Sequence, residues 1–187
     1  MAILNFPEIF SKEKLDLLLC DYKMTDAIIK HKANLSLNMF SFLQTGSKQV
    51  HFADTSVGVN STQSLLIKSG NCLLTELLDN QDIYYCKLLF FSTQKLSIFL
   101  EKNHFQSNKI ETRDAPYFVI ENDVFLKSFI TSLSALSNLQ NPTIQKILEA
   151  KLEELLHYLI YKYKSKFSDF LHSLVAQKTN SIFRLTV

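Results

Sequence analysis

The sequence predicts an α+β fold in which a β-rich half precedes a helical half. Short apolar segments, evenly spaced and separated by polar turns, fill residues 15–91 and are typical of an antiparallel barrel or sandwich. From Ser92 onward, most apolar residues recur with the helical period instead. The chain has 187 residues, of which 47% are hydrophobic, so it can bury a core without help from disulfides or metals.

Seven apolar segments of the first half are expected to form strands. Residues 15–22 are an apolar run, which indicates a strand covered on both faces. Residues 34–43 are apolar at odd positions but also carry Phe40 and Phe42, as a barrel stave would. We place the other strands, which polar turns separate, at 48–52, 57–60, 64–67, 72–78 and 83–91.

The second half is expected to be helical apart from one late strand. A short helix ending at Asn103 comes first, followed by a polar loop over 104–114 and a β-like segment over 117–120. Three helices follow, and each has its own signal in the sequence. We place them at Phe125–Leu136 with Asn122 or Asp123 as the cap, from Asn141-Pro142 to about Tyr163, and over 167–175.

Composition limits the partners and the compartment that we expect. A net charge of +2 is too small to indicate binding of nucleic acid or an anionic membrane by this chain. The sequence has no signal peptide and no apolar stretch long enough to cross a membrane. Three scattered cysteines, Cys20, Cys72 and Cys86, indicate reduced thiols and therefore a cytoplasmic protein.

Residue patterns that carry catalysis or bind metals are not found. The five histidines are isolated from one another, so we expect no metal site and no other cofactor. The cysteines lie in apolar strands, where a buried thiol is more common than a reactive one. There is no Gly-x-Ser-x-Gly elbow and no glycine-rich phosphate loop. We therefore expect no catalytic residue and no enzymatic activity.

Phenylalanine is unusually frequent, with fifteen residues in the chain. Phe40, Phe42, Phe52 and Phe90 all fall on predicted strands of one barrel. Core packing explains them most simply, and the other interpretation is an apolar pocket for a small ligand. We name these four residues as the candidate pocket.

Four segments resemble AraC-type transcription regulators of bacteria. Residues 64–77 resemble the barrel hairpin of that family, and 84–91 resemble the strand that follows it. The short helix over 96–103 comes next, as it does in the family, and 151–160 resembles the Lys-Leu-Glu-Glu-Leu-Leu element of the interdomain helix. The regulatory halves of the ExsA-like subgroup are the most similar.

This resemblance implies a cupin-like barrel followed by a helical dimerisation segment. Residues 1–114 would then be the sensing half, a barrel with one short helix, and 115–187 the dimerisation and interdomain segment. Members of the family sense a small molecule or a partner protein, and those like ExsA respond to an antiactivator protein. The family's DNA-binding half carries two helix-turn-helix units, and we expect it to be missing from this chain after residue 187. We therefore expect DNA binding only in the parent protein.

Two other readings of the sequence stay open. One is a cupin-like metal-dependent enzyme, such as an isomerase or dioxygenase, which would need a clustered metal triad. The other is a free-standing ligand-binding barrel that never acts on DNA. The sequence identifies neither the effector nor the direction of regulation.

The helix from Asn141 to Tyr163 carries more apolar surface than one contact requires. At about 100° per residue its apolar arc is roughly 220° wide. Ile147 lies on one flank of the central stripe, and Leu156 and Ile160 lie on the other. These three residues are our candidate dimer interface, and the flank formed by Leu156 and Ile160 is expected to meet its symmetry mate in a homodimer.

Overall fold

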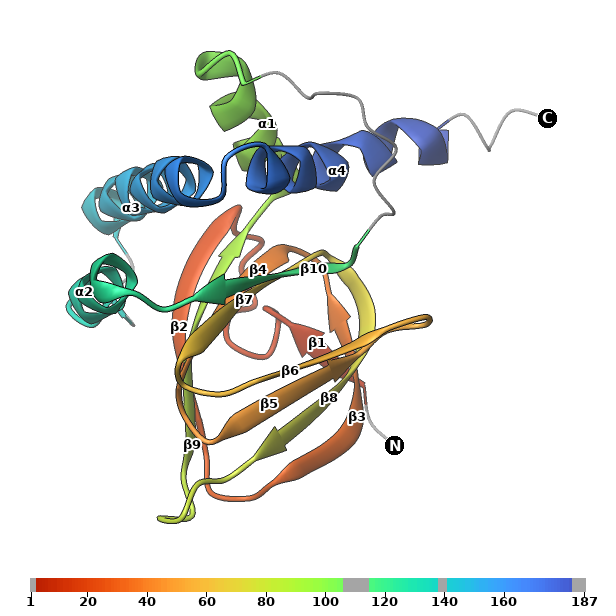
Figure 1. The fold of residues 1–187 in the computed structure, drawn as a ribbon, viewed down its shortest axis with the longest axis vertical. Helices are drawn as coiled ribbons and strands as arrows, with labels where there is room; N and C mark the ends of the chain where they lie inside the picture. Colours follow the sequence, from red (N-terminus) through yellow and green to blue (C-terminus); the bar gives the residue numbers. More distant parts are fainter. Residues whose placement is uncertain (1–2, 106–114, 138–140, 183–187) are drawn as a thin grey trace.

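The computed structural model describes residues 3–105, 115–137 and 141–182, with side chains up to residue 176. Two five-stranded sheets form a barrel-like sandwich, and helices lie against one of them (Figure 1). What we call the outer sheet has the strand order β1 (Leu4–Phe6), β3 (Ile28–Leu35), β8 (Gly70–Leu77), β5 (Ser47–His51) and β6 (Ser56–Val59). What we call the helix-facing sheet has the order β10 (Tyr117–Glu121), β7 (Gln63–Ile67), β4 (Asn38–Thr45), β9 (Tyr84–Phe91) and β2 (Leu17–Met24).

Every strand pair is antiparallel except β1 with β3, which run parallel. This α+β architecture confirms the predicted fold class. The parallel pair brings the start of the chain beside a strand from about 30 residues further along, with Leu4 opposite Ala33. No local pattern signals such a pairing.

Four helices follow or interrupt the strands, and their starts have the expected chemistry. They are α1 (Thr93–Lys102), α2 (Val124–Leu133), α3 (Pro142–Tyr163) and α4 (Ser165–Ile182). Side chains of Ser92, Asp123 and Asn141 accept hydrogen bonds from main-chain amides in the first turns of α1, α2 and α3. These caps satisfy amides that have no partner inside the helix.

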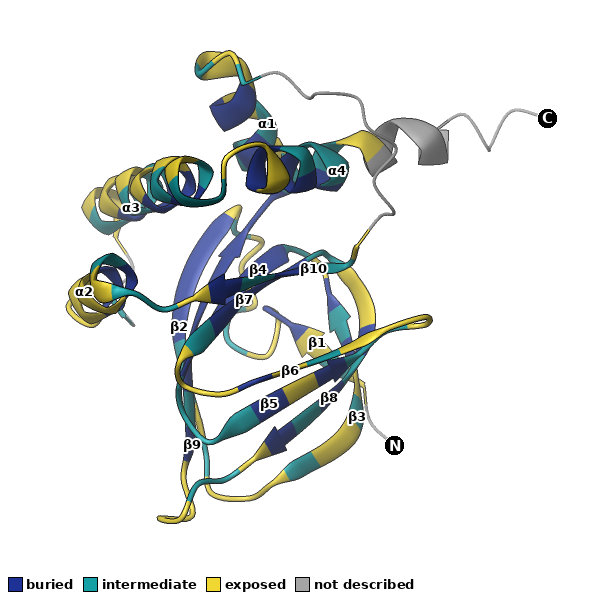
Figure 2. Ribbon diagram, viewed as in Figure 1, coloured by how far each residue is buried: buried dark blue, intermediate teal, exposed yellow. Residues whose placement is uncertain are grey.

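Alternation along the strands of the helix-facing sheet divides the core in two. One apolar cluster fills the barrel between the two sheets, and we call it the barrel core. The other lies between the helix-facing sheet and all four helices, and we call it the helix core. On β9, Leu88 and Phe90 belong to the barrel core, whereas Leu89 and Phe91 belong to the helix core. Figure 2 shows the resulting pattern, with β4 and β9 buried and the outward turns of the helices exposed.

Three expected elements differ from the structure. The single strand expected over 34–43 is the end of β3, a bend at Ser36 and Leu37, and then β4. Most of β3 and all of β1 were missed, because β3 begins with mostly exposed residues that include two lysines and a histidine. Helix α2 ends at Leu133, before the predicted Leu136, and α4 is longer than 167–175 at both ends. Of the predicted loop over 104–114, residues 106–114 lie outside the described part of the chain.

Candidate functional site

The four phenylalanines named as a pocket do not line one cavity. Phe40 and Phe42 stack with ring centroids 5.8 Å apart in the helix core. Phe90 lies in the barrel core, 6.3 Å from the ring of Phe6. Phe52 stacks on Tyr117 at 5.6 Å and is only partly buried. The distribution follows from the pleat, because neighbouring strand residues point to opposite faces of a sheet.

A charged cluster lies inside the barrel, among apolar side chains. The Lys48 ammonium is 3.1 Å from Glu76 Oε1, and the two side chains are 1% and 0% exposed. Lys48 also donates to the hydroxyl of Ser41 at 2.9 Å, and the Tyr84 hydroxyl donates to Glu76 Oε1 at 2.9 Å. Glu76 Oε2 is buried with no hydrogen-bond partner among the described residues. The two charges cancel within the chain.

Titration behaviour around this cluster follows from burial and from its charges. Burial opposes the charged form of Lys48, yet the neighbouring Glu76 holds the pKa of Lys48 above its ordinary value. Burial also raises the pKa of the Cys86 thiol to about 11 and that of Cys20 to about 12. Thiols with such values carry almost no thiolate at neutral pH, so neither is an activated nucleophile.

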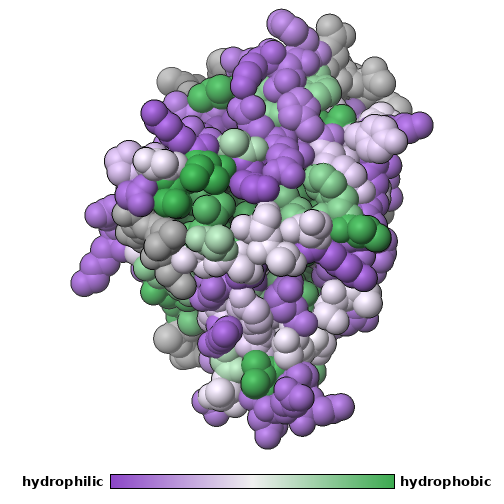
Figure 3. Space-filling model, turned by 90° about the vertical axis from the view of Figure 1, so that its left-hand side faces the viewer, coloured by the Kyte–Doolittle hydropathy of each residue, from purple (hydrophilic) through white to green (hydrophobic). Residues whose placement is uncertain are grey.

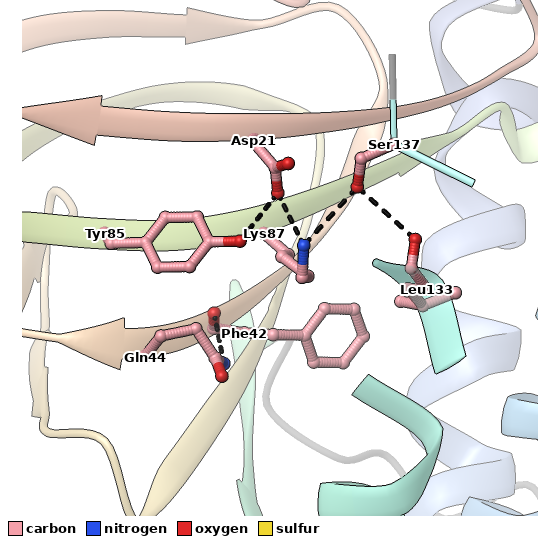
Figure 4. Close-up of polar contacts among 7 residues, drawn as sticks. All are labelled: Asp21, Phe42, Gln44, Tyr85, Lys87, Leu133 and Ser137. Atoms are coloured by element: carbon pink, nitrogen blue, oxygen red, sulfur yellow. Dashed lines mark hydrogen bonds and ion pairs between the residues drawn. The ribbon is translucent and has the colours of Figure 1, made fainter. Parts of the chain in front are cut away.

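A second polar group joins the barrel to the helices, and we call it the junction network: Asp21, Tyr85, Lys87 and Ser137. Asp21 Oδ1 on β2 accepts from Lys87 Nζ at 2.6 Å and from the Tyr85 hydroxyl at 2.9 Å, both on β9. Lys87 also reaches the hydroxyl of Ser137 at 3.4 Å, just beyond α2 (Figure 4). Burial acts to raise the pKa of Asp21, but the hydrogen bond from Lys87 lowers it below its ordinary value, so the carboxylate stays charged. The network thus links two strands to the end of a helix.

Helices α2 and α3 are held together at the opposite end of α2. The Asp123 carboxylate caps α2, accepts a hydrogen bond from Tyr158, and lies 2.8 Å from the Lys162 ammonium. Burial alone would raise the pKa of Asp123, but hydrogen bonds from Lys162 and Tyr158 lower it to about 2. The ring of Phe125 stacks on that of Tyr158, with centroids 3.7 Å apart. Both ends of α2 are therefore fixed.

The candidate interface residues of α3 have three different environments. Leu156 is 0% exposed within the helix core, so it is not on an outward flank as expected. Ile160 is partly buried against the same core, whereas Ile147 is 38% exposed. The buried stripe of α3 includes Leu156 because other elements of the helix core pack on that side, which the sequence of α3 alone does not reveal.

Charged residues of the barrel and the junction were missed by sequence reasoning. A signal was present for Lys48, because it lies two residues before the buried Val50 and so shares its face of β5. Lys87 likewise interrupts an otherwise apolar strand. In the described part of the chain, no group of three or more His, Cys, Asp or Glu side chains is placed to hold a metal ion. None of the described helices is long and apolar enough to span a membrane.

The fold is a filled barrel whose helix-facing sheet also packs against four helices. The family comparison makes this specific: the chain belongs to the ExsA N-terminal regulatory domain family, which matches residues 38–182. This confirms the resemblance to AraC-type transcription regulators. No curated protein matches the sequence.

Solved structures of ToxT from Vibrio cholerae share the fold. A ligand-free ToxT variant is 13% identical with a TM-score of 0.56, covering 81% of this chain and 58% of that one. ToxT bound to (E)-4-(8-methylnaphthalen-1-yl)but-3-enoic acid is 13% identical with a TM-score of 0.54, covering 82% and 60%. ToxT bound to an unsaturated fatty acid is 10% identical with a TM-score of 0.55, covering 81% and 55%. This chain spans less than two-thirds of these structures.

Proposed function

We propose that this chain is the effector-binding and dimerisation part of an AraC-type transcription regulator. It acts on DNA only through a further domain and is not an enzyme. The helix core carries this proposal, because one apolar cluster runs without a break from the helix-facing sheet into all four helices. A change in the position of the barrel strands then also alters the packing of the helices. A stoichiometric transition metal in the purified chain would contradict the non-enzyme part.

Within this function, we propose that the effector is a protein and not a small molecule held in the barrel. The barrel core is filled by the chain's own side chains, including Phe6, Phe90 and Tyr84 at 1% exposure or less. Its buried ammonium group, that of Lys48, is neutralised by Glu76. An acid entering the barrel would have to displace apolar side chains and compete with a carboxylate already in place.

The second candidate is a carboxylic-acid effector, which the acid-bound ToxT structures favour. Thermal unfolding of the chain with and without oleic acid below its critical micelle concentration separates the two. A ligand at 100 times its Kd stabilises by about 2.7 kcal/mol, which raises the Tm of a domain this size by roughly 5–10 °C. We expect no shift. A saturable rise in Tm that Lys48→Met abolishes would support the acid effector instead.

We also propose a homodimer, formed by the outward face of α2 and α3. Val124 is 85% exposed, Ile147 38% and Tyr161 80%. Figure 3 shows the side of the molecule where these helices lie, with several separate hydrophobic areas among hydrophilic ones. Leu156 is left out because its burial removes it from any contact, and Ile160 lies toward the core. Large apolar side chains left exposed on one side of a molecule can mark a contact surface.

Sedimentation of charge variants tests the dimer. Ile147→Asp should give a folded monomer, because a carboxylate buried in the contact would lack a partner. Ile98→Asp is the matched control, since Ile98 is 55% exposed on α1, away from this face. The proposed interface is wrong if Ile147→Asp stays dimeric, and dimerisation itself is refuted if the unmodified chain is monomeric at high concentration.

A further inference from the structure

Strand β10 has an open edge in the part of the chain that the structure describes. It pairs with β7 on one side only, with Phe118 opposite Leu66. The Pro116 carbonyl accepts a hydrogen bond from the Lys68 amide, and the Asn122 amide donates to the Thr62 carbonyl. The main-chain groups of the even-numbered residues therefore point toward β7. In an antiparallel pair the main-chain groups alternate in direction, so Tyr117, Val119 and Glu121 present theirs to the open side.

The chain covers one end of this edge with its own side chains. The Glu121 amide donates to the Tyr163 hydroxyl at 2.9 Å, and its carbonyl accepts from Lys162 Nζ at 2.6 Å. Among the described residues, no group takes up the corresponding amides and carbonyls of Tyr117 and Val119. Two residues of an edge strand are thus left able to hydrogen-bond a further strand.

Two cavities meet at this stretch of β10. One, of about 360 Å³, lies between β10 and α4, where Phe118 and Phe170 form apolar walls and Lys166 and Asp169 add one charge of each sign. The other, of about 810 Å³, lies between β10 and the loop after β5, where Phe52 stacks on Tyr117. The ring of Phe118 belongs to the helix core and that of Tyr117 packs on the barrel core, so the cavities flank the edge from its two faces.

We infer that the open edge of β10 binds an extended peptide segment of a partner protein, which adds a strand beside Tyr117 and Val119. Successive side chains of an added strand point to opposite faces, so they enter the two cavities in turn. A compact small molecule would fill one cavity and leave the main-chain groups unpaired. The segment that fits has apolar side chains at the alternate positions that face Phe118 and Phe170, and no proline opposite Val119.

This inference rests on the proposed protein effector, because it gives that effector a place to dock. The probe is a phage-displayed library of random linear twelve-residue peptides, panned against the 187-residue chain. We expect enriched peptides with alternating apolar residues. Failure to enrich any peptide would overturn the edge site, while the oleic acid and sedimentation results would still decide the proposed function separately.

Val119→Pro is the decisive variant, because it removes the outward amide without touching the bonds to β7. An edge strand tolerates proline where its N–H faces outward. We expect it to weaken binding of the best peptide at least tenfold, whereas Val119→Ala, which keeps the amide, should stay within about threefold. Equal affinity of the two variants would overturn the inference.

A second measurement does not depend on the fold of the variant. Each backbone amide of the bound peptide is methylated in turn, and the affinity for the unmodified chain is measured. A strand paired with β10 loses binding at every second methylated position, because only alternate amides face the edge. A loss without this period of two would show that the peptide binds by side chains alone and would overturn the inference.

Discussion

Breaking the buried pair of Lys48 and Glu76 should cost far more stability than breaking an exposed one. Lys48→Met removes the ammonium group 3.1 Å from Glu76 Oε1 and leaves a carboxylate among apolar side chains at 0% exposure. Removing one partner of a buried ion pair destabilises by about 3–5 kcal/mol. Since a domain of this kind has about 5–15 kcal/mol in total, the variant should retain much less of its stability.

The double variant separates the pair interaction from the loss of each side chain. Glu76→Gln alone leaves the Lys48 ammonium buried with neutral acceptors such as the Ser41 hydroxyl and no neutralising charge, so we expect a similar loss. Lys48→Met with Glu76→Gln buries no charge, and the amide oxygen can still accept from Tyr84. The double variant should therefore lie within about 2 kcal/mol of the unmodified chain, with a coupling energy of about 3 kcal/mol or more.

Urea unfolding followed by far-UV circular dichroism measures these differences, and the chain has no tryptophan to serve as a fluorescent probe instead. Lys102→Met is the matched control, because Lys102 pairs with Glu153 at 3.1 Å with side chains 61% and 42% exposed. An exposed pair contributes about 0–1 kcal/mol. If the losses of the two barrel variants add in the double variant, or if Lys48→Met costs no more than Lys102→Met, the reasoning is refuted.

Three further predictions concern a turn, a cap and the response to acid. Gly46→Ala should destabilise the chain by about 2 kcal/mol or more in urea unfolding, because Gly46 has φ +89° and a Cβ there would lie 2.4 Å from the Leu77 carbonyl oxygen. Gly58→Ala is the control: it makes no such contact and should be tolerated in the same assay. Asn141→Ala should cost about 1 kcal/mol and Asn141→Asp much less, measured by urea unfolding, because aspartate still caps α3. The pKa of Asp123 is lowered from 3.8 to about 2 on folding, so its contribution to the free energy of unfolding is present above pH 4 and is lost toward pH 2. In acid titrations of stability, Asp123→Asn should therefore lose less of its free energy of unfolding between pH 4 and pH 2 than the unmodified chain does.

Local signals predicted most elements, because they depend on neighbours in the chain. Asn141-Pro142 marks the start of α3, and the polar turn at 79–82 separates β8 from β9, as expected. The missed strand β1 has only three residues and pairs with a strand about 30 residues away, so its stability comes from the partner. The periodicity of a sequence depends on neighbouring residues only, so it cannot predict a pairing between strands that are far apart in the chain.

The candidate site was harder to predict, because burial on one side of an element depends on what packs there. Phe40 and Phe90 both read as barrel residues, yet they occupy different cores. Leu156 was expected on an outward flank, yet it is buried in the helix core. Lys48 and Glu76 lie far apart in the sequence, and only the pairing of β5 with β8 places them opposite each other.

The division into two cores means that the helix-facing sheet couples the packing of the barrel to the packing of the helices. On β2, Leu17 and Leu19 pack in the helix core while Leu18 and Cys20 pack in the barrel core. A strand in a close-packed sheet cannot shift on one face alone, since interiors have little free volume. A displacement of β2 would therefore disturb the packing of both cores. Asp21 continues the same strand into the junction network, so a shift of β2 also reaches the end of α2 through hydrogen bonds.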